Sequence, residues 1–95
     1  MLDQLRCEDF EPHLNSPFDM TAGDATTALE LIAVKRLPQY GTARQPFSLL
    51  FRGAGTTVWP QGIYHLSRAG LDQLDIFLVP VGMDESGVRY EAIFS

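Results

Sequence analysis

The chain has 95 residues, of which 45% are hydrophobic, and a formal net charge of −5. A chain of this length supports one compact domain, and its composition is that of a globular protein rather than a disordered one. Its seven Lys and Arg residues are scattered singly apart from Lys35 and Arg36. Because nucleic acids and acidic membrane surfaces both bind clustered positive charge, the sequence argues against either partner.

The first ten residues, MLDQLRCEDF, contain no basic segment followed by an apolar one. The longest apolar runs are far shorter than the roughly 20 residues that span a bilayer. Cys7 is the single cysteine, so an internal disulfide is excluded. We expect synthesis in the cytoplasm without a signal peptide and no membrane insertion. A place in a particle or appendage that is assembled there and exported whole stays open.

The segment LRCEDFEPHLN predicts one short N-terminal helix, over residues 7–14. Phe10 and Leu14 recur at helical spacing. Two acidic residues, Glu8 and Asp9, lie where the first turn of a helix favours negative charge. A brief helix is therefore expected ahead of the rest of the domain.

From residue 17 onward, short apolar runs alternate with Gly, Pro, Asp and Ser, which is the pattern of an all-β domain. TAGDAT and GMDESG are typical hairpin turns, because glycine supplies positive φ. Pro80 cannot donate a backbone hydrogen bond, so it predicts an edge or a bulge in its strand. The expected strands are residues 18–21, 28–37, 47–52, 63–67, 74–81 and 88–94.

The whole pattern predicts a single mainly β domain over residues 1–95, with its β region over 17–95. Consecutive strands are expected to pair antiparallel, as a barrel or a sandwich of about six strands with one short N-terminal helix. In the last strand Val88, Tyr90, Ala92 and Phe94 share one face. The strand at 74–81 is apolar on both faces, so we expect it at the centre, with its second face covered by the helix or by another chain.

The residue types that carry chemistry are few and scattered. Cys7, His13 and His65 lack the close spacing of zinc frameworks. Ser86, within ESGV, is better explained by a polar hairpin turn than by a strained nucleophile turn. We expect no metal, no cofactor and no enzymatic activity.

Arg52, at the end of FSLLFRG, allows two interpretations. It can form a structural cross-strand ion pair with Glu91, which occupies the mixed face of the last strand. It can instead present a fixed guanidinium at a binding surface, where it would hold a partner's carboxylate through two hydrogen bonds. Arg52 is therefore a candidate interaction residue, together with Trp59 and Tyr64.

The aromatic residues Trp59, Tyr64, Tyr40 and Tyr90 raise a separate alternative. Together they could form the platform that a small-molecule or carbohydrate-binding β module needs. Buried or rim aromatic residues explain the same pattern, so both interpretations are carried forward.

The motifs PFSLLFRG, PQGIYHL, LDQLDIFLVPVG and RYEAIF, in this order, resemble those of a family of small bacterial domains of unknown function. The resemblance runs from EDFEPHLNSPF to the C-terminus, and a longer GAGTTVW segment departs from the usual pattern. The family has no assigned catalytic residues. Its genes are associated with those of phage-tail-collar-like proteins, which implies a structural or protein-interaction role in a phage-tail-like or surface-fibre assembly. The implied partner is a second copy of the chain or a neighbouring subunit.

Overall fold

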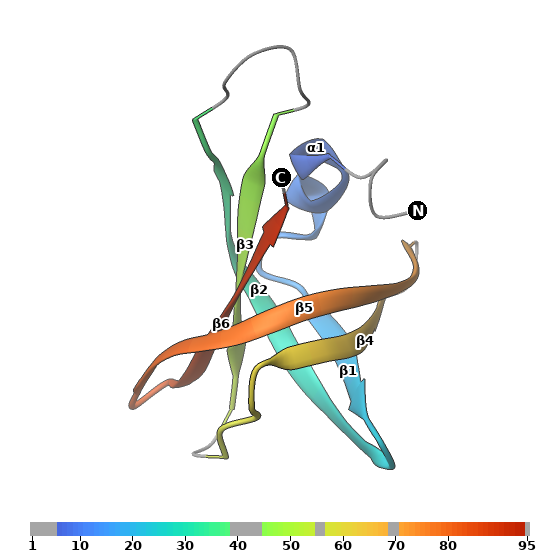
Figure 1. The fold of residues 1–95 in the computed structure, drawn as a ribbon, viewed down its shortest axis with the longest axis vertical. Coiled ribbons are helices and arrows are strands. Elements are labelled where there is room, and N and C mark those ends of the chain that lie inside the picture. Colours follow the sequence, from blue (N-terminus) through green and yellow to red (C-terminus); the bar gives the residue numbers. More distant parts are fainter. Residues whose placement is uncertain (1–5, 39–44, 55–56, 69–70, 95) are drawn as a thin grey trace.

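The structure is a computed structural model that describes residues 6–38, 45–54, 57–68 and 71–94. Six antiparallel strands form a closed barrel in the order β1-β2-β3-β6-β5-β4 (Figure 1). The elements are α1 (Cys7–Phe10), the 3-10 helix η2 (Glu11–His13), β1 (Pro17–Ala22), β2 (Ala25–Arg36), β3 (Phe47–Gly53), β4 (Gly62–Arg68), β5 (Leu71–Asp84) and β6 (Gly87–Phe94). The predicted mainly β fold with a short N-terminal helix is confirmed, and the chain adopts the barrel rather than the sandwich.

The barrel closes through two strand pairs that are not consecutive in the chain. Strands β1, β2 and β3 pair in sequence order, as do β4, β5 and β6, which confirms those predicted neighbours. The predicted pairing of consecutive strands is wrong for β3 and β4, because the remaining pairs are β3 with β6 and β1 with β4. Closure pairs the backbone groups that would otherwise line two sheet edges. Pro80 predicted either a sheet edge or a bulge in its strand. The described sheet has no edge there, and a bulge lies between Pro80 and Gly82.

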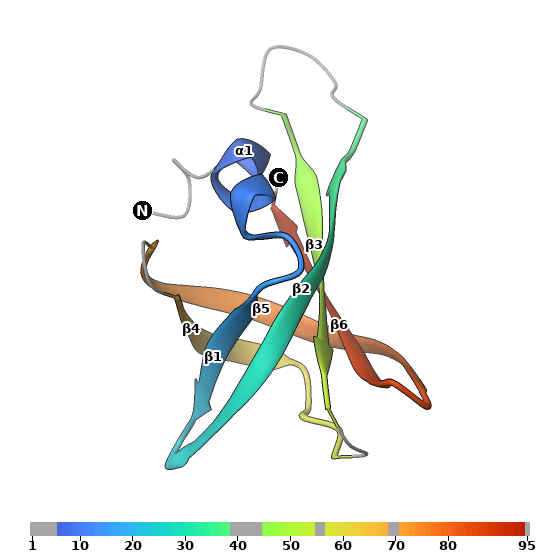
Figure 2. The ribbon, with the colours of Figure 1, turned by 180° about the vertical axis from the view of Figure 1, so that it is seen from behind.

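Both predicted hairpin turns form, and each contains a glycine with positive φ. Gly23, between β1 and β2, has a φ of 59°, and Gly87, the first residue of β6, has a φ of 131°. The β5–β6 hairpin projects sideways from the barrel in both views (Figures 1 and 2). Local turn chemistry thus fixes where two of the barrel's strand pairs begin.

Side chains that alternate along the strands fill the barrel. The inward faces of β3 and β6 are buried throughout: Phe47, Leu49 and Phe51 of β3, and Val88, Tyr90, Ala92 and Phe94 of β6. The period of two predicted for the last strand is confirmed. Residues from β1, β2, β4 and β5 complete the same core cluster. The interior is therefore a packed core built from every strand.

The N-terminal helix covers one end of the barrel. Phe10 is fully buried, and its ring centroid lies 5.9 Å from that of Phe47 and 5.8 Å from that of Phe94. Those two rings stack on each other, with centroids 4.7 Å apart. Figures 1 and 2 show α1 beside the start of β3 and the end of β6. The helix therefore closes the core by inserting one aromatic side chain.

The outer face of β5 differs from its prediction. Ile76 and Leu78 point into the core and are buried. Phe77 and Val81 are each 52% exposed, because α1 packs on the barrel end rather than on the outside of β5. No described segment therefore supplies the expected second cover.

Candidate functional site

Arg52 forms a cross-strand ion pair, but with a different partner from the predicted one. Its Nη2 lies 2.6 Å from Oε1 of Glu30, which is directly opposite on β2. The predicted partner, Glu91, stands opposite Leu50 in the β3–β6 pairing. The register places Arg52 opposite Arg89 on that side, so the pairing with Glu91 is wrong. The cross-strand ion pair itself is present.

Arg89, the β6 neighbour of Arg52, is held by the β5–β6 turn. Its guanidinium forms an ion pair with the Asp84 carboxylate. Asp84 also accepts hydrogen bonds from the Ser86 backbone N–H at 2.8 Å and from the Ser86 hydroxyl at 2.6 Å. The Ser86 hydrogen bonds are the main cause that lowers the pKa of Asp84 to about 2, and Arg89 adds to it. Arg52 and Arg89 are thus both neutralised by acidic neighbours, which weakens the case for an anion site here.

The Asp84 contacts predict an acid-sensitive hairpin. Because the folded-state pKa is about 2 and the unfolded value is 3.8, this group stabilises the fold above pH 3.8. That contribution is lost as the pH falls through 2. Carboxyl NMR of Asp84 should therefore titrate near pH 2, and Ser86→Ala should raise the midpoint. A midpoint near 3.8 in the native protein would show that the turn contacts do not form.

Tyr90 and Tyr64 both contact the segment that contains Trp59, at the barrel end opposite α1 (Figures 1 and 2). The Trp59 backbone N–H donates to the Tyr90 hydroxyl at 2.9 Å, and the Tyr64 hydroxyl donates to the Pro60 carbonyl oxygen. Tyr64 and Tyr90 are buried and Trp59 is half-buried. Burial raises the pKa of Tyr64, which keeps its hydroxyl a donor. Two tyrosines therefore hold residues 57–61 across the end of the barrel, a segment that we call the strap.

Removing the Tyr90 hydroxyl should loosen the strap without emptying the core. Tyr90→Phe leaves the Trp59 N–H without its partner, and we expect a loss of about 1 kcal/mol in the free energy of unfolding. Acrylamide should also quench Trp59 fluorescence more strongly. Tyr64→Phe is the matched control, since the exposed Pro60 carbonyl can accept from water instead, and its cost should be smaller. Equal quenching in wild type and Tyr90→Phe would contradict this role.

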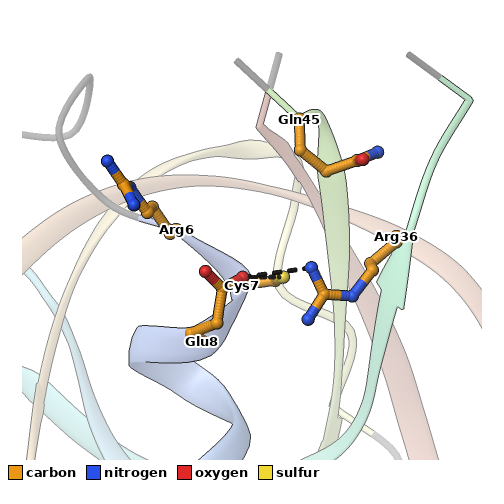
Figure 3. Close-up of a pocket in the computed structure, with 5 residues that line it drawn as sticks. All are labelled: Arg6, Cys7, Glu8, Arg36 and Gln45. Atoms are coloured by element: carbon orange, nitrogen blue, oxygen red, sulfur yellow. Dashed lines mark hydrogen bonds and ion pairs between the residues drawn. The ribbon is translucent and has the colours of Figure 1, made fainter.

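A small cavity of about 230 Å³ lies between α1 and the β2–β3 end of the barrel, lined by Arg6, Cys7, Glu8, Arg36 and Gln45 (Figure 3). The Cys7 thiol donates to Glu8 Oε1 at 2.7 Å, and Arg36 Nη1 donates to the same oxygen at 3.1 Å. Figure 3 shows Arg36 pointing toward Glu8, whereas Arg6 and Gln45 point away from that pair.

The chemistry of this cavity is that of a structural contact. Burial is the main cause that raises the pKa of Cys7, and the Glu8 contact adds to it, so the thiol is protonated at neutral pH. The hydrogen bond from Cys7 is the main cause that lowers the pKa of Glu8. A neutral thiol is a poor nucleophile. The Glu8–Arg36 pair instead ties α1 to β2.

The described surface also carries an apolar row across three neighbouring strands. Ile63 of β4 stands directly opposite Phe77 of β5. The β5–β6 pairing ends at Val79 and Glu91, and Ile93 lies two residues further along β6, the other neighbour of β5. Their exposed fractions are 70%, 52% and 60% in the order Ile63, Phe77, Ile93. We call these three residues the apolar row.

In the part of the chain that the structure describes, no group of three or more His, Cys, Asp and Glu side chains is arranged to hold a metal ion. No helix within the described ranges is both long and apolar enough to cross a membrane.

The sequence matches a known protein family. Residues 5–94 match the model of a domain of unknown function, DUF6916. The chain belongs to this family. No curated protein and no solved structure matches it significantly. The DUF6916 assignment confirms the predicted membership of a domain family of unknown function.

The predicted interaction candidates of this DUF6916 domain occupy two separate places. Arg52 lies on the outside of the barrel, while Trp59 lies in the strap and Tyr64, in β4, donates a hydrogen bond to it. Tyr40 and residues 55–56 of the GAGTTVW segment fall outside the described residues. Sequence reasoning did not single out the apolar row. Its signal was present in the strand at 74–81, where apolar residues occupy both faces.

Proposed function

We propose that this DUF6916 domain is a non-catalytic protein-binding domain whose contact surface is the apolar row. The observation that carries the proposal is the exposure of Ile63 and Phe77, directly opposite each other on β4 and β5, together with that of Ile93 on the neighbouring strand β6. Single exposed apolar residues are ordinary, but a contiguous apolar surface marks a contact site. Burying a large apolar side chain contributes about 1.5–3 kcal/mol, so three of them supply a substantial binding free energy.

The charges around the apolar row favour a different protein over a second copy. Glu91 lies two residues from Ile93, and Asp75 lies two residues from Phe77, where it pairs with His65. The net charge of the chain is −5. Two copies would bring like charges together, whereas a partner with Lys or Arg around an apolar surface would be complementary. We therefore propose a neighbouring subunit with a basic rim as the occupant.

The proposed setting is a phage-tail-like or surface-fibre assembly. Its support is the family resemblance, which implies an association with phage-tail-collar-like genes. The alternative, a small-molecule or carbohydrate-binding module, has less support because Tyr64 and Tyr90 are buried rather than displayed as a platform. Each of these two hydroxyls also engages the strap.

The test uses threonine substitutions, which remove apolar surface while keeping strand propensity. A variant with Ile63→Thr, Phe77→Thr and Ile93→Thr should melt close to the wild-type temperature but lose its partner. The control variant carries Leu14→Thr and Val58→Thr, which are 41% and 50% exposed and lie outside the apolar row. A source-cell extract is passed over the wild type, the control and the triple variant. A protein that the first two retain and the triple variant does not is purified, and its binding to each of the three is then measured.

Restored binding of the purified partner to wild type and control, with at least a tenfold loss for the triple variant, would support the proposal. Equal binding to all three would overturn it. Sedimentation should show a monomer for the isolated protein. A dimer that dissociates in the triple variant would replace the proposed subunit with a second copy of the chain.

A further inference from the structure

Arg68 at the end of β4 is hydrogen-bonded to His13 in η2. Arg68 Nε donates to His13 Nδ1 at 2.9 Å, and Arg68 Nη1 donates to the Pro17 carbonyl oxygen at 2.8 Å. A guanidinium has only donors, so His13 Nδ1 must offer a lone pair. The contact therefore requires a neutral His13 with its proton on Nε2. We call this contact the His13–Arg68 clasp.

The clasp joins the N-terminal helical segment to the barrel. His13 ends η2, which follows α1 directly, and its ring packs edge-on against Phe18 of β1, with centroids 6.1 Å apart. Arg68 belongs to a strand 55 positions away in the chain. The helical segment in turn keeps Cys7 and Phe10 buried on the barrel end. Opening the clasp would weaken that cover.

We propose that the His13–Arg68 clasp is an acid-sensitive catch for the N-terminal helical segment. Protonation of His13 removes the acceptor at Nδ1 and places two cations in contact, so the neutral form is required for closure. Histidine is the side chain that ordinarily changes charge between about pH 5 and 8. Protonation therefore releases η2 from Arg68 of β4 and weakens the cover that α1 provides, while the barrel itself stays folded.

The nearby carboxylates do not offset this repulsion. Glu11, in the same 3-10 helix, lies 3.6 Å from Arg36 and is engaged with it. Glu30 stands opposite Pro17 in the β1–β2 pairing, but it forms its ion pair with Arg52. Arg68 is the charged group that faces His13 from β4. The clasp thus joins a permanent cation to an imidazole that must stay neutral for the contact to hold.

The buried Cys7 thiol reports on the release. Its reaction with 4,4′-dithiodipyridine is measured at about pH 7.5 and about pH 5.5, and each rate is divided by that of urea-unfolded protein at the same pH. We expect the normalised rate to rise about tenfold in acid, the change that loss of one charge-assisted hydrogen bond produces. Far-ultraviolet circular dichroism should show intact strands at both pH values.

The chain has two histidines, which supplies the matched control. His13→Gln keeps an acceptor that cannot be protonated in this range and should abolish the rise, whereas His65→Gln should retain it. Arg68→Gln should react rapidly at both pH values. A flat wild-type profile, or a rise of equal size in His13→Gln, would overturn the proposal.

Amide hydrogen exchange of the wild type tests the catch without any substitution. After correction for intrinsic rates, protection of residues 7–13 should fall at about pH 5.5, while that of β3 and β6 stays unchanged. Unchanged protection of residues 7–13 would count against the catch even if a variant fails to fold.

Discussion

Gly87→Ala is expected to destabilise the barrel by about 3 kcal/mol or more, because it combines backbone strain with a steric clash. A Cβ at this position would lie 2.0 Å from the Gly53 carbonyl oxygen. That oxygen belongs to the backbone of β3, next to the β3–β6 pairing, so it cannot move away freely. The φ of 131° is also one that residues with a side chain rarely adopt.

Gly23→Ala is the matched control for this prediction. Gly23 also has positive φ, but a Cβ there would meet no atom within 4 Å. Its cost should be limited to about 1 kcal/mol of backbone strain. Urea unfolding followed by circular dichroism compares the two variants. Equal losses would show that the close approach of Gly87 to β3 is absent.

Phe10→Ala should cost about 3–5 kcal/mol, the range for deleting a buried aromatic side chain. Phe10 is fully buried against Phe47 and Phe94, so the substitution leaves a cavity at the barrel end. The helix that Phe10 anchors has only four residues and is too short to be stable alone. The variant should therefore also expose Cys7 to thiol reagents.

Leu14→Ala provides the comparison, because Leu14 is 41% exposed. Its effect on the urea midpoint should be much smaller. Retention of wild-type stability and slow thiol reaction in Phe10→Ala would contradict the closing role of α1. It would mean that the six strands exclude water from Phe47 and Phe94 without the helix.

Turn-forming residues in the sequence predicted the strands and hairpins, because those features are local. Gly23 and Gly87 mark turns whose backbone needs positive φ, and Pro80 marks a bulge where no backbone donor is required. The β3–β6 and β1–β4 pairs join distant parts of the chain. No local pattern specifies them, which is why the choice between barrel and sandwich stayed open.

The candidate site was less predictable, because it depends on register. Alternation assigned Arg52 and Glu91 to mixed faces, but the register pairs Arg52 with Glu30. Tyr64 donates to a backbone carbonyl in the strap, a contact with no signal in residue type. The apolar row was visible in part, since the strand at 74–81 carries apolar residues on both faces.

Photo-cross-linking from position 77 tests partner binding most directly. A benzophenone analogue of phenylalanine in place of Phe77 should link the domain, in its source cells, to one other protein through a segment rich in Lys or Arg. The same analogue at Thr26, an exposed position on β2, is the control and should give no such product. Equal products from both positions, or a product from position 77 that contains only a second copy of the chain, would contradict binding of a neighbouring subunit at the apolar row.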